Sequence, residues 1–419
     1  MPAPTSPQSK LPFVVVLLTL GTFLMNTTEF MIAGLLPEMA AAFDVSLSTT
    51  ALLITAFAIG MIVGAPVMSV ATLRFPRRVT LFVALAVFAL GHVLAALSST
   101  FEVVLGARVL TALVTGMFWA VAAVVATTAA GPAAASRALG LMMSGTGLAT
   151  VVGVPLGSLA GQVIGWRGSF WALATLAVLA AALIARFVPA EERREIPRIR
   201  SEIAALRNRP IWLVLAGAVL VTGGWVAVFS FISPLLTDGA GLSATLVPMV
   251  LVGFGVGALV GTNVSGRLAD RRPIGTFIAA ALANTVVLAL LAVLAGSPVI
   301  AVVLLVLLGV TGMAVPPVAT GLAVCYARSA PTLAAALAVS AFNLGIALGS
   351  WVGGRALDSS LGVTGPALIG AVGAALGLVP LLALARATKP ASHDEKTAGT
   401  HHHEHDASGL EPATASAAG

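Results

Sequence analysis

Long apolar runs separated by short polar turns recur along the whole chain. Each run has roughly 20 residues, which is enough for a helix to cross a hydrocarbon layer about 30 Å thick. A transmembrane barrel would instead give alternating segments of about ten residues. The pattern therefore predicts an all-α polytopic membrane protein with twelve spans, at about residues 13–36, 47–70, 79–98, 102–127, 138–161, 168–187, 211–236, 244–266, 274–296, 299–325, 332–354 and 365–386.

Composition supports this prediction and excludes a soluble domain with a large core. Of the 419 residues, 58% are hydrophobic and only 9% are charged, with a mean hydropathy of +1.04, whereas a soluble domain is about 25% charged. The net charge of +6 does not indicate nucleic-acid binding, because the basic residues follow the loops.

The arginines gather on one side of the predicted membrane. Only Arg167 and Arg355 lie at helix ends on the other side. By the positive-inside rule, we expect a multi-pass protein of the cell membrane with both termini and the arginine-rich side in the cytoplasm. The residues that define this arginine-rich side are Arg74, Arg77, Arg78, Arg137, Arg193, Arg194, Arg198, Arg200, Arg207, Arg209, Arg267, Arg271, Arg272 and Arg328.

The longest and most charged connection divides the spans into two groups of six. We expect a cytoplasmic N-terminal tail at 1–12, a first half at 13–188, a cytoplasmic linker at 189–210, a second half at 211–388 and a disordered cytoplasmic tail at 389–419. Short basic turns after the second and eighth spans favour an internal duplication. Two six-helix halves around a central cavity are typical of transporters. The His401–His405 segment of the tail has no second ligand set, so we expect no functional metal site and no cofactor.

Two charged side chains lie within predicted spans. Glu29 is about seven residues, or roughly 10 Å, below the outer end of the first span, and Arg108 is about six residues, or roughly 9 Å, below the start of the fourth. A charge within the membrane is costly and is a functional hypothesis by default. Matching depth predicts that the two charges pair. Burial favours the protonated acid and the arginine favours the carboxylate, so a changing Glu29–Arg108 distance would load or release a proton. A permanent structural ion pair is the alternative.

Polar and aromatic residues recur at helical spacing on the first, fourth and seventh spans, which favours a shared cavity over three separate packing faces. From helical position we expect the substrate to contact Asn26, Trp119, Trp225, Phe229, Phe342 and Asn343. Few charges line such a cavity, so it suits a small, neutral, amphiphilic molecule.

The fifth span carries glycines at a spacing of four. Gly153, Gly157 and Gly161 would let another backbone approach closely, and Pro155 would bend the helix. With the following Gln162-Val163-Ile164-Gly165-Trp166-Arg167-Gly168, this stretch resembles the antiporter motif of the major facilitator superfamily, in its twelve-helix drug:H⁺ antiporter group.

Other stretches strengthen the resemblance, which covers about residues 10–388. Thr28-Glu29-Phe30 with Gly34-Leu35-Leu36-Pro37 looks like that group's first-helix motif, and Arg108 followed by Gly116 looks like its fourth-helix motif. Gly266-Arg267-Leu268-Ala269-Asp270-Arg271 resembles the superfamily's loop motif, which implies a gating role for Gly266, Asp270 and Arg271. The first-half loop departs from that motif, with Leu73 in place of the aspartate.

Within the group, the chain is most similar to actinobacterial chloramphenicol efflux proteins. The resemblance implies a proton-coupled exporter of chloramphenicol or a related drug, and we expect the protein to be a monomer. Exporters of sugars and purine nucleosides share the first- and fifth-helix motifs, so they stay open as alternatives. A channel or a polytopic membrane enzyme is a further alternative, although no HExxH, GxSxG or GxxxxGK[ST] motif is present. We therefore expect no enzymatic activity.

Overall fold

The structure is a computed structural model that describes residues 11–72, 75–131, 134–189, 208–327 and 331–388. Within these ranges, twelve helices are long and apolar enough to cross a membrane. The predicted all-α polytopic fold is therefore confirmed, and each predicted span overlaps one of these helices. The two tails, the His-rich segment and most of the predicted linker lie outside the described residues.

The first half contains six spans, one of which has an irregular turn. That turn is π-helical, covers Ala149–Gly153 and ends two residues before Pro155. The helices are α1 (Phe13–Phe43), α2 (Leu47–Ala71), α3 (Arg77–Leu97), α4 (Phe101–Ala130), α5 (Ala135–Leu148), α6 (Val154–Ile164) and α7 (Trp166–Phe187), with α5, the π-helical turn and α6 forming the fifth span.

The second half has two interruptions that sequence chemistry explains. Pro234 lacks the N–H that would continue α8, and Pro316 and Pro317 do the same at the break between α12 and α13. The helices are α8 (Arg209–Phe229), α9 (Ile232–Pro234), α10 (Val247–Ala269), α11 (Pro273–Leu294), α12 (Pro298–Gly312), α13 (Val315–Ala327), α14 (Pro331–Leu357) and α15 (Gly365–Ala387).

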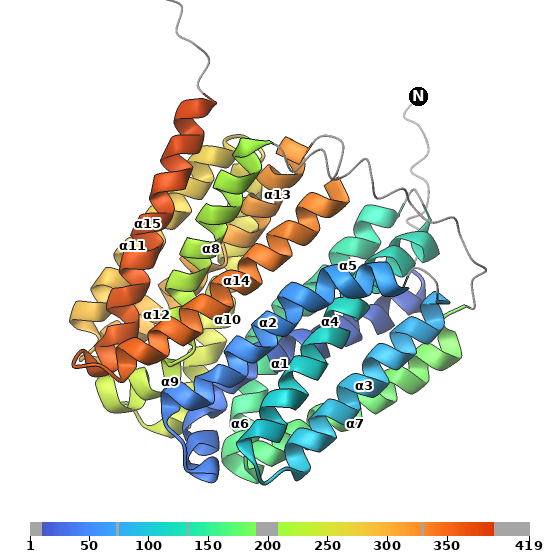
Figure 1. Cartoon of the computed structure of the whole chain (residues 1–419), viewed down its shortest axis with the longest axis horizontal. Coiled ribbons are helices and arrows are strands. Elements are labelled where there is room, and N and C mark those ends of the chain that lie inside the picture. The colour runs from blue at the N-terminus through green and yellow to red at the C-terminus, as the bar shows by residue number, and fades with distance from the viewer. Residues whose placement is uncertain (1–10, 73–74, 132–133, 190–207, 328–330, 389–419) are drawn as a thin grey trace, which may run out of the picture.

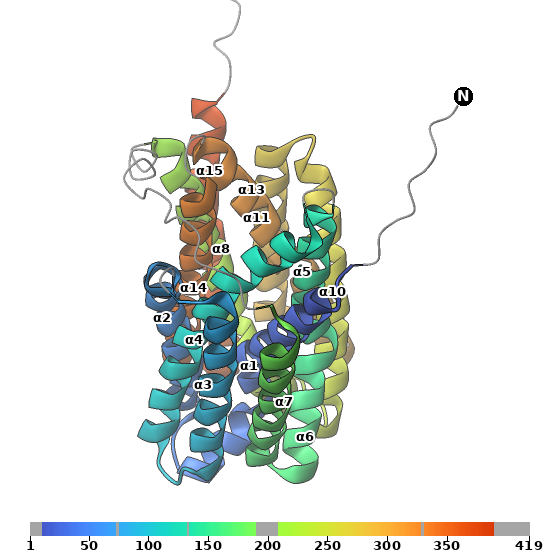
Figure 2. The ribbon, with the colours of Figure 1, turned by 90° about the vertical axis from the view of Figure 1, so that its right-hand side faces the viewer.

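The two halves lie next to each other, with α2 packed along α14 at their boundary (Figure 1). On another part of the boundary, α6 and the π-helical turn pack against α10 (Figure 2). Two hydrogen bonds between described residues join the halves: Thr55 with Ser350 at 2.7 Å, and Gln162 Nε2 with the Ala244 carbonyl at 2.7 Å. Both lie on the side opposite the arginine-rich side.

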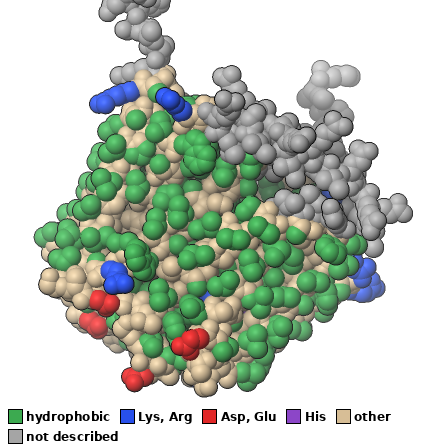
Figure 3. Space-filling view, viewed as in Figure 1, with side chains coloured by type: hydrophobic (Ala, Val, Ile, Leu, Met, Phe, Trp, Pro, Cys, Tyr) green, Lys and Arg blue, Asp and Glu red, His purple; other side chains and the backbone are tan. Residues whose placement is uncertain are grey.

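The outer surface has the character of a protein embedded in lipid. Hydrophobic side chains cover most of the face in Figure 3, and the clusters of charged side chains visible there lie toward its margins. Large exposed side chains such as Val293 and Val299 are apolar. In a membrane, such residues face hydrocarbon, so their exposure carries no penalty.

Candidate functional site

Arg108 on α4 is almost completely buried and ties three helices together. Its Nη1 donates hydrogen bonds to the hydroxyl of Thr28 at 2.9 Å and to the Thr28 carbonyl at 3.0 Å. Its Nε donates to the Leu53 carbonyl on α2 at 3.3 Å, and its guanidinium lies 4.3 Å from the centre of the Phe57 ring. The cation is thus stabilised by oxygens and by an aromatic face.

Thr28 connects this arginine to a histidine on α3. The Thr28 hydroxyl lies 2.8 Å from Nε2 of His92, and Nδ1 of His92 lies 2.8 Å from the Phe88 carbonyl. Because a carbonyl oxygen only accepts, Nδ1 carries the proton, and in a neutral ring Nε2 then accepts from the Thr28 hydroxyl. A second cation beside Arg108 would be repelled, so this geometry fits a neutral imidazole.

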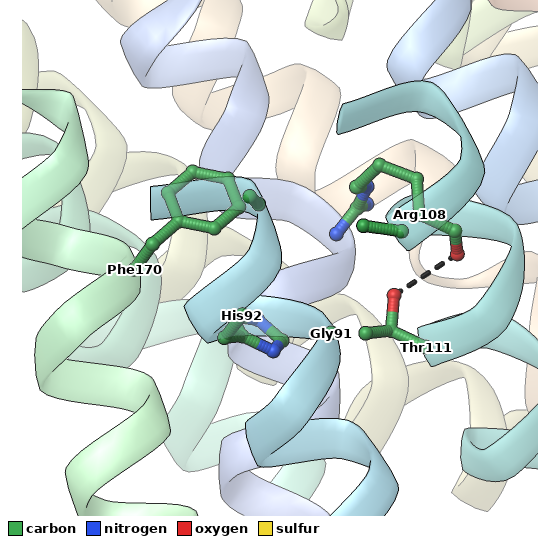
Figure 4. A pocket seen from close by; sticks show the side chains of 7 residues that line it. Gly91, His92, Arg108, Thr111 and Phe170 are labelled. Carbon is green, nitrogen blue, oxygen red and sulfur yellow. Dashed lines mark hydrogen bonds between the residues drawn. The ribbon is translucent and has the colours of Figure 1, made fainter. Parts of the chain in front are cut away.

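The result is a continuous hydrogen-bonded chain from Arg108 through Thr28 to His92. Figure 4 shows His92 and Arg108 in one narrow pocket, which Phe170 and Thr111 also line and which has no room for a water molecule. One donor is left over: Nη2 of Arg108 is buried and has no hydrogen-bond partner among the described residues. A buried cationic donor without an acceptor is costly, and it is a site that an additional anion or carboxylate would stabilise.

The predicted ion pair between Glu29 and Arg108 is not formed in this structure. No Glu29 oxygen lies within 4.0 Å of the guanidinium in the described part of the chain, although the two groups are close enough to interact electrostatically. The reason is helical geometry: successive residues of a helix point about 100° apart, so Thr28 takes the direction toward Arg108. Glu29 is half-buried on the adjoining face.

An aromatic cluster next to Glu29 crosses the boundary between the halves. The Phe30 ring lies 5.7 Å from Phe229 and 6.1 Å from Trp225, between ring centres. Phe254 lies 4.7 Å from Phe229 and 6.0 Å from Trp225. The cluster contains two of the predicted substrate residues, Trp225 and Phe229, and both are buried. Phe30, the residue after Glu29, thus contacts the second half.

Buried polar atoms without a hydrogen-bond partner in the described part of the chain occur on three helices that carry predicted substrate residues. They are Nδ2 of Asn26 on α1, Nε1 of Trp225 and Oγ1 of Thr222 on α8, and Oδ1 of Asn343 on α14. Most buried polar atoms in folded proteins have a partner, so such atoms are places where a substrate or water would bind. Asn26, Trp225 and Asn343, three of the predicted substrate residues, each carry one such atom; their contact with one substrate stays a prediction.

Trp119 and Phe342 are placed differently. Both are half-buried, on α4 and α14, and no hydrogen bond or ring contact in the described ranges connects them to the aromatic cluster. Their predicted contact with the substrate remains a prediction.

The glycines of the fifth span form the expected close-packing face. A Cβ placed on Gly153 would strike Thr27, one on Gly157 would press on Met31 at 3.3 Å, and one on Gly161 would strike Leu35. The three glycines, four residues apart on the fifth span, thus each face one of three residues that are four apart on α1. On its other side, the π-helical turn lies against Gly255 of α10, so at this point the fifth span lies between α1 and α10.

The loop motif of the second half lies away from this site. Gly266, Asp270 and Arg271 stand at the end of α10 on the arginine-rich side, where Asp270 and Arg271 are exposed. The gating role that the resemblance implies for them stays a prediction.

His92 is the residue that sequence reasoning missed. It is an ionisable side chain inside the apolar third span, so the rule that singled out Glu29 and Arg108 applies to it equally. Its link to Thr28, however, depends on packing between α1 and α3.

Two six-helix halves, a buried polar chain within the membrane spans and aromatic contacts between the halves define a membrane transporter. Residues 18–331 match the Major Facilitator Superfamily, and the chain belongs to that family, whose members are transporters and not enzymes.

Relatives and solved structures agree with this assignment. The chain is 36% identical over 360 residues to a chloramphenicol resistance protein of Streptomyces lividans, which covers 85% of this chain and 92% of that protein. It is 33% identical to the inner membrane transport protein YdhP of Escherichia coli K12 (90% and 97% covered) and 30% identical to a probable sugar efflux transporter of Mannheimia succiniciproducens (88% and 92% covered).

The fold is similar to that of a bacterial homologue of the human lysosomal transporter Spinster, solved in an inward-facing conformation. The TM-score is 0.70 at 18% sequence identity, with 89% of this chain and 95% of that chain covered. The predicted resemblance to the superfamily and to chloramphenicol efflux proteins is confirmed.

Proposed function

We propose that this protein is a proton-coupled antiporter of the cell membrane that exports a small, neutral, amphiphilic drug, with chloramphenicol as the leading candidate. Its termini lie in the cytoplasm, as the positions of the arginines favour. The observation that carries the proposal is Glu29, an acid inside the membrane between the Arg108–Thr28–His92 chain and the aromatic cluster.

Proton coupling follows from how Arg108 distributes its donors. In the present arrangement Thr28 and Leu53 accept from Nη1 and Nε, while Nη2 is free. A protonated, neutral Glu29 gains little from Arg108 and remains apart from it. When Glu29 loses its proton, the carboxylate is stabilised by moving to the free Nη2, because an ion pair inside the membrane relieves the cost of both charges.

Substrate binding follows from the neighbouring cluster. A flat, weakly polar molecule would stack among Phe30, Trp225 and Phe229 and would offer partners to the free atoms of Asn26 and Asn343. The similarity to the chloramphenicol resistance protein of Streptomyces lividans supports the choice of substrate. A second candidate is a sugar, which the similarity to the sugar efflux transporter supports, although the cluster offers few hydrogen-bonding groups for one.

The proposal is tested by the accumulation of labelled chloramphenicol in cells that contain the protein. We expect low accumulation that rises to the empty-vector level when a protonophore collapses the proton gradient. Accumulation at the vector level throughout, with the protein present in the membrane, would refute the chloramphenicol assignment. Low accumulation that the protonophore does not change would refute proton coupling. Labelled sugars, tested in the same cells, decide the second candidate.

A further inference from the structure

A large pocket lies in the second half, and none of its lining residues belongs to the proton or substrate site described above. It has a volume of about 700 Å³ and is enclosed by α10, α11 and the break between α12 and α13. Small residues create the space: Gly275, Ala279, Ala283 and Ala314 line the walls where larger side chains would fill it.

The pocket begins at the membrane surface and continues into the hydrocarbon layer. It starts near the first turn of α11, at Gly275, and reaches Ala283, eight residues or roughly 12 Å further along the helix. Val264 and Leu268, also in its lining, are 49% and 54% exposed. Exposed aliphatic side chains at this depth face lipid, so the pocket is accessible from the bilayer.

Two arginines complete the pocket at its polar end. Arg271 and Arg272 belong to its lining, are exposed, and have no side-chain hydrogen bond or ion pair within the described part of the chain. The exposed carboxylate of Asp270 precedes them but does not line the pocket. The pocket thus combines apolar walls at acyl-chain depth with two free guanidinium groups at headgroup depth.

We propose that this pocket binds one anionic phospholipid, with an acyl chain along α11 and the phosphate at Arg271 and Arg272. Guanidinium groups suit phosphate oxygens, and basic pockets between membrane helices on the cytoplasmic side are known to suit anionic headgroups. The inference is independent of the transported substrate, because no residue of the proton or substrate site lines the pocket.

The test measures lipid binding to the purified full-length protein by native mass spectrometry. Phosphatidylglycerol and phosphatidylcholine with identical acyl chains are titrated separately. We expect one phosphatidylglycerol to bind at least tenfold more tightly than phosphatidylcholine. The double substitution Arg271→Gln/Arg272→Gln should remove this preference, because each arginine contributes to attraction of the anionic headgroup.

Two further variants distinguish a built pocket from general surface charge. Arg267→Gln removes an exposed arginine in the last turn of α10 that does not line the pocket, and it should leave the preference unchanged. Ala283→Phe fills the inner end and should weaken binding of both lipids severalfold. Equal binding of the two lipids by the wild type, or an equal loss of preference in Arg267→Gln and in the double variant, would overturn the proposal. The readout does not depend on transport, so it stands or falls separately from the proposed function.

Discussion

Thr28→Val removes the hydroxyl that connects Arg108 to His92 while keeping the shape of the side chain. Thr28 is completely buried, so water cannot replace the hydroxyl. Arg108 Nη1 retains the Thr28 carbonyl at 3.0 Å, but Nε2 of His92 loses its donor at 2.8 Å. A buried acceptor left without a partner costs about 1–3 kcal/mol, and we expect this loss in the free energy of unfolding.

Thermal melting in one detergent measures this effect, with Thr28→Ser as the matched control. The serine keeps the hydroxyl and loses one methyl group, which costs about 0.8 kcal/mol. Thr28→Val should therefore melt below Thr28→Ser, and both below the wild type. If the valine variant melted with the wild type, the hydrogen bond to His92 would contribute nothing.

A double-mutant cycle identifies the cause of the loss. His92→Phe replaces the orphaned nitrogen with an apolar ring of similar shape. If the orphaned acceptor causes the loss, Thr28→Val should be less damaging in the His92→Phe background, with a coupling of about 0.5–3 kcal/mol. Additive effects would show that the loss has another origin and would refute the reasoning.

Three other predictions concern coupling, packing and substrate contact. Glu29→Gln should abolish uphill, proton-driven transport of the substrate and leave downhill exchange. One proton at 100 mV is worth about 2.3 kcal/mol, which sustains a substrate concentration ratio of roughly 50-fold across the membrane, and this ratio should fall to unity in the variant. The control Glu102→Gln changes an exposed acid and should transport normally in the same vesicles. Gly153→Ala should lower the melting temperature, because its Cβ would strike Thr27, whereas Gly140→Ala adds a methyl group in open space and should not; equal melting of the two would contradict the packing. Trp225→Phe keeps an aromatic ring, although a smaller one, and removes the indole N–H that has no partner among the described residues. The KM for chloramphenicol should therefore rise about three- to tenfold through one lost hydrogen bond, and an unchanged KM would exclude that contact.

The twelve spans could be predicted because their lengths and apolar composition are properties of single segments. Interruptions within them were harder to place. The predicted seventh span ran to residue 236, but α8 ends at Phe229, since Pro234 cannot continue the hydrogen-bonding pattern. The tenth span was predicted as one helix, and Pro316 and Pro317 divide it near Ala314.

The candidate site was predictable only in part. The rarity of charge in a membrane span singled out Glu29 and Arg108, and spacing placed them at similar depth. The spacing could not show that Thr28 would take the position facing Arg108, because a rotation of one residue about the helix axis lies below the precision of predicted span boundaries. His92 enters the site through packing of α3 on α1, which no local pattern encodes.

Four consecutive residues of α1 show how one helix can connect the separate parts of the site. Thr27 packs on Gly153 of the fifth span, Thr28 joins Arg108 and His92, and Phe30 contacts the aromatic rings of the second half. At about 100° per residue, these directions surround the helix, and Glu29 occupies the one between Thr28 and Phe30. A small rotation of α1 therefore changes the distance from Glu29 to Arg108 and the contact of Phe30 with Trp225 together. A substrate that separates Phe30 from Trp225 would favour such a rotation, and so would the loss of a proton from Glu29. Substrate and proton would then act on the same helix, α1, without any direct contact between them.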